Sequence, residues 1–465
     1  MKRRNTTLAT AFVLLLVAAT SAFANSSFDR MNTKENQFLL RSADIDSVVA
    51  EYGITVIRRH GSPSGDIWLV EAPEGSSVDQ VLAAMEADVS IQSAEAVSLA
   101  GLPSVTLEGR TGNLGSVITR SGTFSTPCLD TYMPGAWSGF SDQALATMIQ
   151  ITDAQNYIGC GEGIVIAVID TWIDTEHTHL RSAITGGYDF TKETAYFAGA
   201  EQLDLDIRQS AIVESSETAL LAGQAAHTVT LSNSVVLLGE ADPETEADLH
   251  ALPEYYGHGT MTAGLLRVVA PAAQIMPLVA FDEHGNGHPI DIIAAIYHAV
   301  DNGADVINMS FSMNEHSPEL YEALEYARSN GVIPVAASGN SGSLQNAFPA
   351  SYGSTVGVAS TDWQDQLTDF SNYGIYTADI TAPGVELVTF FPHGTYSLGW
   401  GTSFSTPLVA GTVALIRHMH NGSNKGTHKN LRLDLLLGGV YHDYLWDYIY
   451  SGRRLNTYGA FVQSL

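Results

Sequence analysis

The chain has 465 residues, and 21 lysines and arginines against 50 aspartates and glutamates give a formal charge of 21 − 50 = −29. A chain this acidic repels nucleic acids and anionic membrane surfaces, and no basic patch interrupts the acidity, so both are excluded as expected partners. The length suffices for one large α/β core together with a smaller domain.

The first 24 residues have the pattern of a secretory signal peptide. Residues 2–4 are basic, residues 8–19 are apolar, and Ala22-Phe23-Ala24 forms a small-x-small cleavage pattern. The apolar stretch is too short for a membrane span, and no other stretch is long enough. We therefore expect a signal peptide over residues 1–24, a secreted or periplasmic protein, and no membrane association after signal removal.

Residues 35–97 predict a small α+β domain. Strands are expected at residues 36–40, 54–59, 67–72 and 89–94. Apolar residues at helical spacing predict one helix ending before Gly53, and the capping box Ser77-Val78-Asp79-Gln80 begins a second helix. The resulting order βαββαβ is that of a ferredoxin-like unit.

Residues 98–126 read as a linker, because they are rich in Gly, Ser and Thr and lack periodicity. The only two cysteines follow, at Cys128 and Cys160. In an exported protein such a pair forms one disulfide, although two free buried thiols are the alternative. No Cys-rich metal site is present.

The segment Gly163 to Asp170 is a continuous apolar run that ends in a carboxylate. It predicts a buried parallel strand with Asp170 at its carboxyl end, where open α/β sheets place their sites. An acidic insertion follows at residues 191–254. Its carboxylates suit a structural calcium ion, but no regular ligand loop is visible, so a solvated loop is favoured and no metal is assigned.

His258 lies between two glycines, in Gly257-His258-Gly259, just before small residues that suit a tightly packed helix. After it, strands and helices alternate. This rhythm predicts a doubly wound parallel sheet of the α/β class. The expected strands are residues 274–280, 305–310, 332–337 and 355–359, and the expected helices are residues 289–301 and 317–330.

Ser403 lies in Gly401-Thr402-Ser403-Phe404-Ser405-Thr406-Pro407, where a loop should turn into a helix. Asp170, His258 and Ser403 occur in one of the known chain orders of a nucleophilic triad. A serine needs a base to take its proton, histidine titrates near neutrality, and the imidazolium needs a buried carboxylate. These three residues therefore suit the roles of orienter, base and nucleophile.

With these three motifs the chain, from about Ile151 to Val462, resembles the subtilisin-like serine peptidases (subtilases, peptidase family S8). The resemblance implies a subtilisin-like catalytic domain over residues 127–465. It implies a secreted serine endopeptidase that hydrolyses polypeptides through an acyl-enzyme intermediate, with no cofactor required.

The resemblance also implies further roles. Asn340, after the expected strand 332–337, would donate a hydrogen bond to the oxyanion. Substrate would bind by strand addition along Ser310-Phe311-Ser312 and at Ala337-Ser338-Gly339. The domain at residues 35–97 resembles an inhibitor-I9-like propeptide, which implies a zymogen inhibited by its own propeptide.

Some positions depart from the family pattern. Trp172 stands where glycine is usual, and so do Ser312 and Met313 beside the specificity pocket. We expect Trp172 to border the substrate cleft. These departures leave one alternative open, a degraded subtilase that binds peptides without efficient turnover. A zinc hydrolase is disfavoured, because the pairs His177 with His179 and His284 with His288 fall in expected loops and no His-Glu-x-x-His motif occurs.

Overall fold

The computed structural model describes residues 36–86, 88–102, 126–196, 228–232, 235–238, 252–420 and 428–465. The expected signal peptide, most of the linker and most of the acidic insertion lie outside the described residues. Among the described residues, no helix has the length and apolar character needed to cross a membrane.

The N-terminal domain has the predicted order βαββαβ. Its antiparallel sheet has the strand order β2-β3-β1-β4. Gly53 ends the first helix at φ 66°, and Ser77 and Gln80 form the predicted capping box at the start of the second. The elements are β1 (Gln37–Ser42), α2 (Ile45–Tyr52), β2 (Thr55–Ser62), β3 (Gly65–Glu71), α3 (Val78–Met85) and β4 (Ile91–Ala96).

The large domain is built on the predicted parallel sheet. Its central strands are all parallel, in the order β16-β15-β14-β13-β6-β11. Both faces of these strands are buried, which explains why they read as unbroken apolar runs. Their bounds are β6 (Val165–Asp170), β11 (Gln274–Val279), β13 (Val306–Met309), β14 (Ile333–Ala337), β15 (Val356–Thr361) and β16 (Ile380–Pro383).

Shorter strands extend both edges of the sheet. One edge carries β7 (Gly187–Asp189) and β8 (Thr194–Tyr196), and the other carries β20 (Arg453–Arg454) and β19 (Val440–Tyr441).

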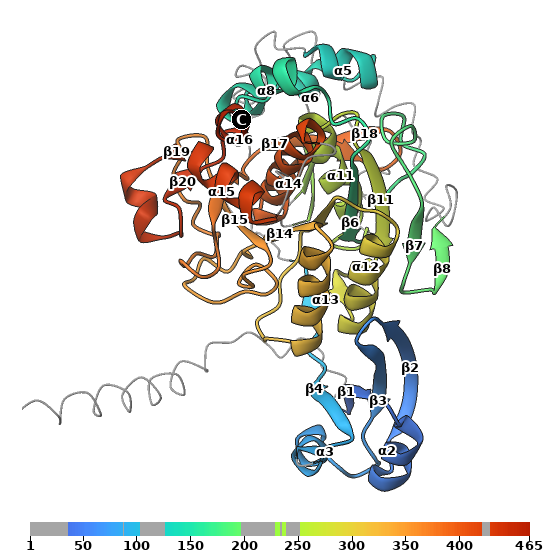
Figure 1. Ribbon diagram of the computed structural model, residues 1–465. Helices are drawn as coiled ribbons and strands as arrows, with labels where there is room; N and C mark the ends of the chain where they lie inside the picture. Colours follow the sequence, from blue (N-terminus) through green and yellow to red (C-terminus); the bar gives the residue numbers. More distant parts are fainter. Residues whose placement is uncertain are drawn as a thin grey trace, which may run out of the picture.

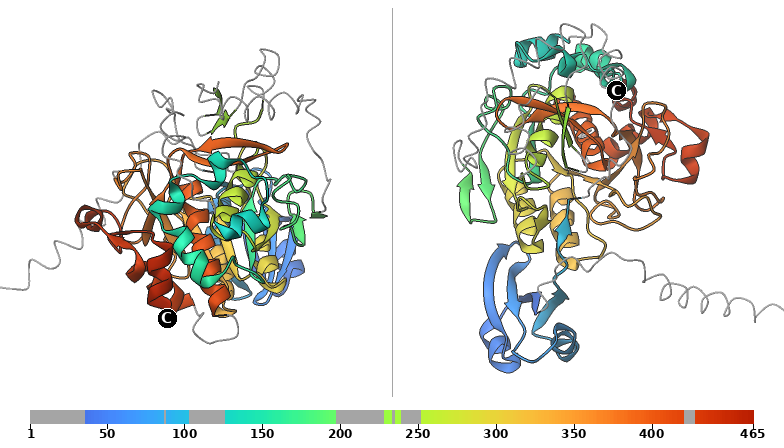
Figure 2. Two further views of the ribbon diagram at one scale, coloured as in Figure 1. Left: turned by 90° about the horizontal axis from the view of Figure 1, so that it is seen from above. Right: turned by 180° about the vertical axis from the view of Figure 1, so that it is seen from behind.

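Helices cover both faces of the sheet (Figures 1 and 2). On one face, α11 (His258–Val269) and α14 (Thr402–Met419) share a core with Ile166 and Val168 of β6. On the other, α12 (Pro289–Asp301) and α13 (Pro318–Ser329) share a second core with the alternate residues of β6. This arrangement is the doubly wound α/β fold that the sequence predicts.

The remaining elements surround this core. A second, antiparallel sheet was not predicted from the sequence; it has the order β17-β18-β10-β9. The strands of this second sheet are β9 (Thr228–Ser232), β10 (Val235–Leu238), β17 (Leu387–Phe391) and β18 (Thr395–Gly399). The remaining helices are α5 (Pro127–Tyr132), α6 (Ser138–Ser141), α7 (Leu145–Met148), α8 (Ile151–Ile158), α15 (His428–Gly438), the 3₁₀ helix η2 (Asp443–Asp447) and α16 (Thr457–Ser464).

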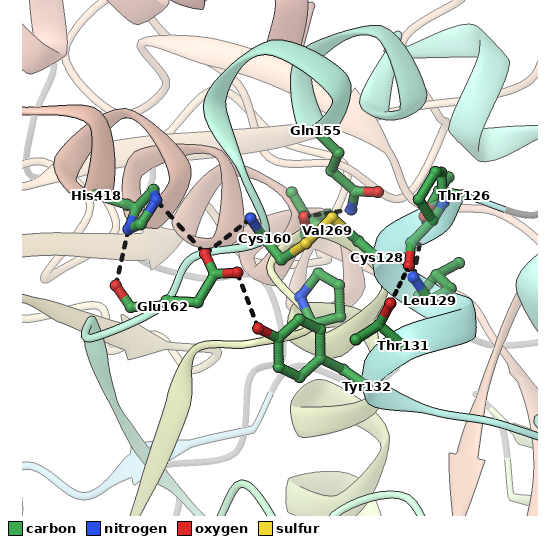
Figure 3. Close-up of a disulfide and its surroundings, with 12 residues drawn as sticks. Thr126, Cys128, Leu129, Thr131, Tyr132, Gln155, Cys160, Glu162, Val269 and His418 are labelled. Atoms are coloured by element: carbon green, nitrogen blue, oxygen red, sulfur yellow. Dashed lines mark hydrogen bonds and ion pairs between the residues drawn. A yellow bond between two sulfur atoms is a disulfide. The ribbon is translucent and has the colours of Figure 1, made fainter.

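Cys128 and Cys160 form the expected disulfide, with their Cα atoms 5.5 Å apart (Figure 3). The bond joins α5 to the turn that follows α8. Beside it, Glu162 accepts hydrogen bonds from the Cys160 backbone and from the Tyr132 hydroxyl. The disulfide therefore fixes the N-terminal helices of the large domain to its body.

The N-terminal domain docks on the ends of α12 and α13 (Figure 1). Arg41 of β1 forms a buried ion pair with Glu319 of α13, and Arg58 of β2 pairs with Asp291 of α12. Beyond β4 the chain forms a two-residue strand, β5 (Ala100–Gly101), which pairs with β12 (Asn286–Gly287). The expected linker therefore begins with a strand that is bound to the large domain.

Candidate active site

Asp170 and His258 meet at the carboxyl edge of the sheet. Asp170 is the last residue of β6, and His258 is the first residue of α11. The Nδ1 atom of His258 lies 2.7 Å from Oδ1 of Asp170, and both side chains are buried. The carboxylate also accepts the backbone N–H of Thr171 at 2.7 Å and the hydroxyl of Thr262 at 3.3 Å. This environment holds the imidazole in one orientation.

Gly259 allows α11 to approach the end of β6. A Cβ atom at this position would lie 2.5 Å from the carbonyl oxygen of Thr171, closer than two such atoms can pack. The glycine after His258 in the sequence motif is therefore required by the close approach of helix and strand.

Ser403 lies in the first turn of α14, and the residue after it contacts the imidazole of His258. The ring of Phe404 packs against His258 with a centroid separation of 5.6 Å. The Ser403 hydroxyl donates to the carbonyl oxygen of Ser310 at 3.0 Å, and the Ser310 hydroxyl donates to the carbonyl oxygen of Ser403 at 2.8 Å. His258 Nε2 is buried and has no hydrogen-bond partner. The start of α14 therefore packs against the base, while the Ser403 hydroxyl is bonded to Ser310.

Asn340 follows β14 and is oriented by the residue before Ser403. Its Oδ1 atom accepts the backbone N–H of Thr402 at 2.9 Å and the Thr402 hydroxyl at 2.8 Å. Because both bonds use the oxygen, the amide nitrogen is the donor on the opposite side of the group. Asn340 thus lies next to Ser403, as the oxyanion prediction requires.

The two expected substrate-binding segments face each other. Ser310 and Phe311 are buried, whereas Ser312 is partly exposed. Opposite them, Ala337 and Ser338 are buried, and Gly339 has φ 94°. A Cβ atom on Gly339 would lie 3.1 Å from the Ser312 hydroxyl oxygen. The Ser312 side chain therefore occupies part of the space between the segments.

The edge at Ser312 is paired with the chain's own N-terminal segment. The N–H of Gly101 donates to the carbonyl oxygen of Ser312 at 3.1 Å, and the N–H of Ser312 donates back at 3.2 Å. The N–H of Leu102 donates to the carbonyl oxygen of Gly285 at 3.0 Å. An extended peptide thus lies between the residues after β13 and those after β11.

Trp172 belongs to an aromatic group that sequence reasoning did not find. Its half-buried ring stacks on Tyr256 at a centroid distance of 6.4 Å, and the Tyr256 hydroxyl lies 2.9 Å from Nε2 of His393. Burial raises the pKa of Tyr256 and lowers that of His393. The only sequence signal was the Tyr255-Tyr256 pair just before Gly257.

The histidine pairs considered as zinc ligands do not assemble a metal centre. Burial, followed by the neighbouring His179, lowers the pKa of His177 to about 3, and the His177 ring stacks on Phe390. His284 lies near Glu283 instead. Among the described residues there is no group of three or more His, Cys, Asp or Glu side chains able to hold a metal ion.

Comparisons with known proteins identify the family of the chain. Residues 161–435 match the Subtilase family, Peptidase_S8. A thermophilic serine proteinase from Bacillus sp. (strain AK1) is 34% identical over 254 residues, covering 55% of this chain and 52% of that protein. Thermitase from Thermoactinomyces vulgaris is 29% identical over 266 residues, covering 55% of this chain and 75% of thermitase.

A solved structure supports the fold. Fervidolysin from Fervidobacterium pennivorans, described as a keratinolytic enzyme related to subtilisin, aligns with a TM-score of 0.67 at 20% identity. The alignment covers 94% of this chain and 62% of fervidolysin. The chain thus spans about half the length of the Bacillus relative and under two thirds of fervidolysin. Because the family match extends over more than half of the chain and includes Asp170, His258, Asn340 and Ser403, this protein belongs to the subtilase family.

Proposed function

We propose that this protein is a secreted serine endopeptidase that hydrolyses polypeptides through an acyl-enzyme intermediate. Ser403 is the nucleophile, His258 the general base, Asp170 the residue that orients the imidazole, and Asn340 the oxyanion donor. No cofactor takes part.

The reaction follows from the positions of these groups. The Ser403 oxygen attacks the carbonyl carbon of the peptide while His258 Nε2 takes its proton, and the buried Asp170 stabilises the imidazolium. Asn340 donates to the oxygen that becomes negative. His258 then protonates the leaving amine, the C–N bond breaks, and a water repeats the sequence to release the acyl group.

The observation that carries the proposal is the buried hydrogen bond of 2.7 Å between His258 and Asp170. Phe404, the residue after Ser403 in α14, packs against the same imidazole. The Ser403 hydroxyl needs only a rotation about its Cα–Cβ bond to leave Ser310. Catalytic hydrogen bonds are often formed only when substrate is bound, so its contact with Ser310 is compatible with the role of nucleophile.

The N-terminal domain has the position expected of an inhibitory propeptide. It docks on α12 and α13, and β5 leads from it to the peptide-binding edge at Ser312. A polypeptide substrate pairs with the same backbone groups, so the domain and the substrate compete for them. We propose that the domain is removed during maturation.

The disulfide supports export. Disulfides form and persist in oxidising compartments, and Cys128 and Cys160 are bonded. This fits the signal peptide predicted over residues 1–24 and a secreted or periplasmic location.

Two observations favour the second candidate, a peptide-binding subtilase without efficient turnover. The Ser403 hydroxyl is bonded to Ser310, and Trp172 stands where glycine is usual. In this alternative the protein binds extended peptides at Ser312 but does not cleave them.

Hydrolysis of an unfolded protein substrate decides between the two candidates. We expect the processed chain to hydrolyse it, and the Ser403→Ala variant to lose all but a trace of activity while keeping its fold. His258→Ala should be about as damaging, since nucleophile and base act as one unit. An inactive wild type that still binds peptides would favour the second candidate.

A further inference from the structure

A cavity of about 290 Å³ lies outside the triad and has an unusual lining. Three tyrosines, Tyr373, Tyr444 and Tyr448, form part of its wall, together with the carboxylate of Asp369. None of the residues that the structure places in its lining is a lysine, arginine or histidine. The cavity is thus aromatic and negatively charged.

The three rings stand at steep angles to one another. The rings of Tyr373 and Tyr448 lie 5.2 Å apart at 80°, and those of Tyr444 and Tyr448 lie 6.4 Å apart at 65°. The three rings therefore present different orientations to the cavity that they line. The electron-rich ring faces attract a cation, which is the interaction that binds ammonium and guanidinium groups in proteins.

The surrounding charges favour a cation as well. Asp362 and Asp365 lie close enough to Tyr444 to help raise its pKa to about 12, after the larger effect of burial. Of these two, Asp365 is already paired with Arg454 at 2.8 Å and lies 3.3 Å from Nε2 of His442, so Asp362 is the carboxylate that favours an added cation. Asp369 is an exposed residue of the cavity lining.

The cavity lies close to the oxyanion donor. Gly342 in its lining is two residues from Asn340, so their Cα atoms are within about 8 Å of each other. Ser371, also in the lining, precedes Asn372, which binds the carbonyl oxygen of Ser338 through its side chain. The loops that hold Asn340 therefore also shape the cavity.

The cavity and the bound segment β5 belong to different parts of the carboxyl edge of the sheet. β5 contacts residues that follow β13 and β11, whereas the cavity is lined by residues that follow β14, β15 and β19. In the sheet order β15-β14-β13-β6-β11, Ser310 after β13 and Asn340 after β14 stand between the two. We expect a polypeptide substrate to follow the path of β5 up to Ser403. The residues after its scissile bond then lie toward the cavity.

We infer that this cavity binds a lysine or arginine side chain on the leaving-group side of the scissile bond. The inference rests on the proposed peptidase function and adds a substrate preference to it. The net charge of −29 favours the approach of the same basic polypeptides.

Two variants remove the attraction in different ways. Asp369→Asn deletes the charge at constant size, and Tyr448→Leu removes one aromatic wall. The matched controls are Asp443→Asn and Tyr376→Leu, since both residues are exposed and neither lines the cavity. None of these four residues belongs to the proposed catalytic machinery.

The experiment uses fluorogenic peptides that differ only by Lys or Gln at each of the first positions after the cut. We expect the wild type to favour Lys about fivefold in kcat/KM at one position, which corresponds to ~1 kcal/mol. The ratio of kcat/KM for the Lys peptide to that for the Gln peptide should fall toward one in both cavity variants and stay unchanged in both controls. In the wild type this ratio should fall with added salt. A Lys preference that is absent, or unchanged in the cavity variants, would overturn the inference while hydrolysis itself upheld the peptidase function.

Should no peptide be cleaved, the proposed function fails, and fluorescence anisotropy with the same peptides still tests the cavity. Tighter binding of a Lys peptide than of its Gln counterpart, lost in Asp369→Asn, would then support the cation site. Equal binding would overturn it.

Discussion

The Asp170 carboxylate is fully enclosed and is held by three donors, of which His258 is one. Asp170→Asn keeps the size of the side chain, but its amide favours the wrong imidazole tautomer. We expect kcat/KM to fall on the order of 10,000-fold, a magnitude taken from the equivalent substitution in another serine peptidase. Thr262→Val is the matched control, since it removes the longest of the three bonds to the carboxylate, together with the bond from the Thr262 hydroxyl to the carbonyl oxygen of Gly259. Steady-state kinetics with one peptide should separate the two, and losses of similar size would contradict the role of Asp170.

The Ser312 hydroxyl restricts the space opposite Gly339. Ser312→Gly should therefore increase the relative kcat/KM for peptides with large residues before the cut, by about tenfold for one or two added carbons that the pocket newly accepts. A cleavage profile on a peptide library measures this change. An unchanged profile would show that Ser312 does not limit the pocket.

The motifs of the sequence pointed to Asp170 and His258, which are hydrogen-bonded, and to Asn340 and Ser403, of which Asn340 bonds the residue before Ser403. They were readable because strand ends, glycines and helix starts constrain the local sequence strongly, as Gly259 illustrates. The bond from Ser403 to Ser310 was not predictable, since it depends on one side-chain rotation between residues 93 positions apart. Tyr256 and the cavity tyrosines were missed for the same reason, because aromatic residues in loops have no spacing rule.

Helices and parallel strands were predicted well where local signals agree. α13 has Ser317 as its cap and Pro318 in its first turn, and it begins within a residue of the predicted position. The antiparallel sheet β17-β18-β10-β9 was missed. It consists of two local hairpins, and they are joined only by the pairing of β10 with β18, which are more than 140 positions apart. β5 was taken for linker, since Ala-Gly has no strand preference and its partner β12 is distant.

The interface between β4 and α13 should depend on pH through Glu95. Its carboxyl accepts the Ser317 hydroxyl at 2.7 Å, while its second oxygen is buried without a partner. The pKa of Glu95 is raised from 4.5 to about 7, mainly by burial and also by the charge of Glu319. The hydrogen bond from Ser317 and the charge of Arg41 act to lower the same pKa. The pKa of Glu95 is higher in the docked domain than in the undocked one. The contribution of Glu95 to docking is therefore complete below pH 4.5 and is lost as the pH rises through 7.

His60 acts in the opposite direction at the same interface. Its ring stacks on Tyr297 of α12, and burial lowers its pKa, so docking weakens as the pH falls below 6.5. Glu95→Gln removes only the weakening of docking that the ionisation of Glu95 causes at high pH. We expect hydrogen-exchange protection of α13 in the Ser403→Ala chain to drop between about pH 6 and 8, and to persist when Glu95→Gln is added. Glu86→Gln, on the exposed side of the same domain, is the control, and identical profiles for all three chains would contradict the account.

The disulfide connects the start of the large domain to its body across 32 positions. Replacing Cys128 and Cys160 together by alanine should lower the free energy of unfolding by about 3–4 kcal/mol, because a loop of this size is no longer closed in the unfolded chain. Denaturant unfolding of both proteins, in the Ser403→Ala background to prevent self-digestion, measures the difference. Equal stabilities would show that the cross-link does not restrain the unfolded chain.

The central claim is that Ser403 is a nucleophile activated by His258 and Asp170. Reaction with a fluorophosphonate, followed by mass spectrometry of the digested protein, tests it most directly. After removal of the N-terminal domain, we expect one covalent adduct per chain, located on Ser403 and absent in His258→Ala. An intact, processed chain with no adduct, or with its adduct on another residue, would contradict it.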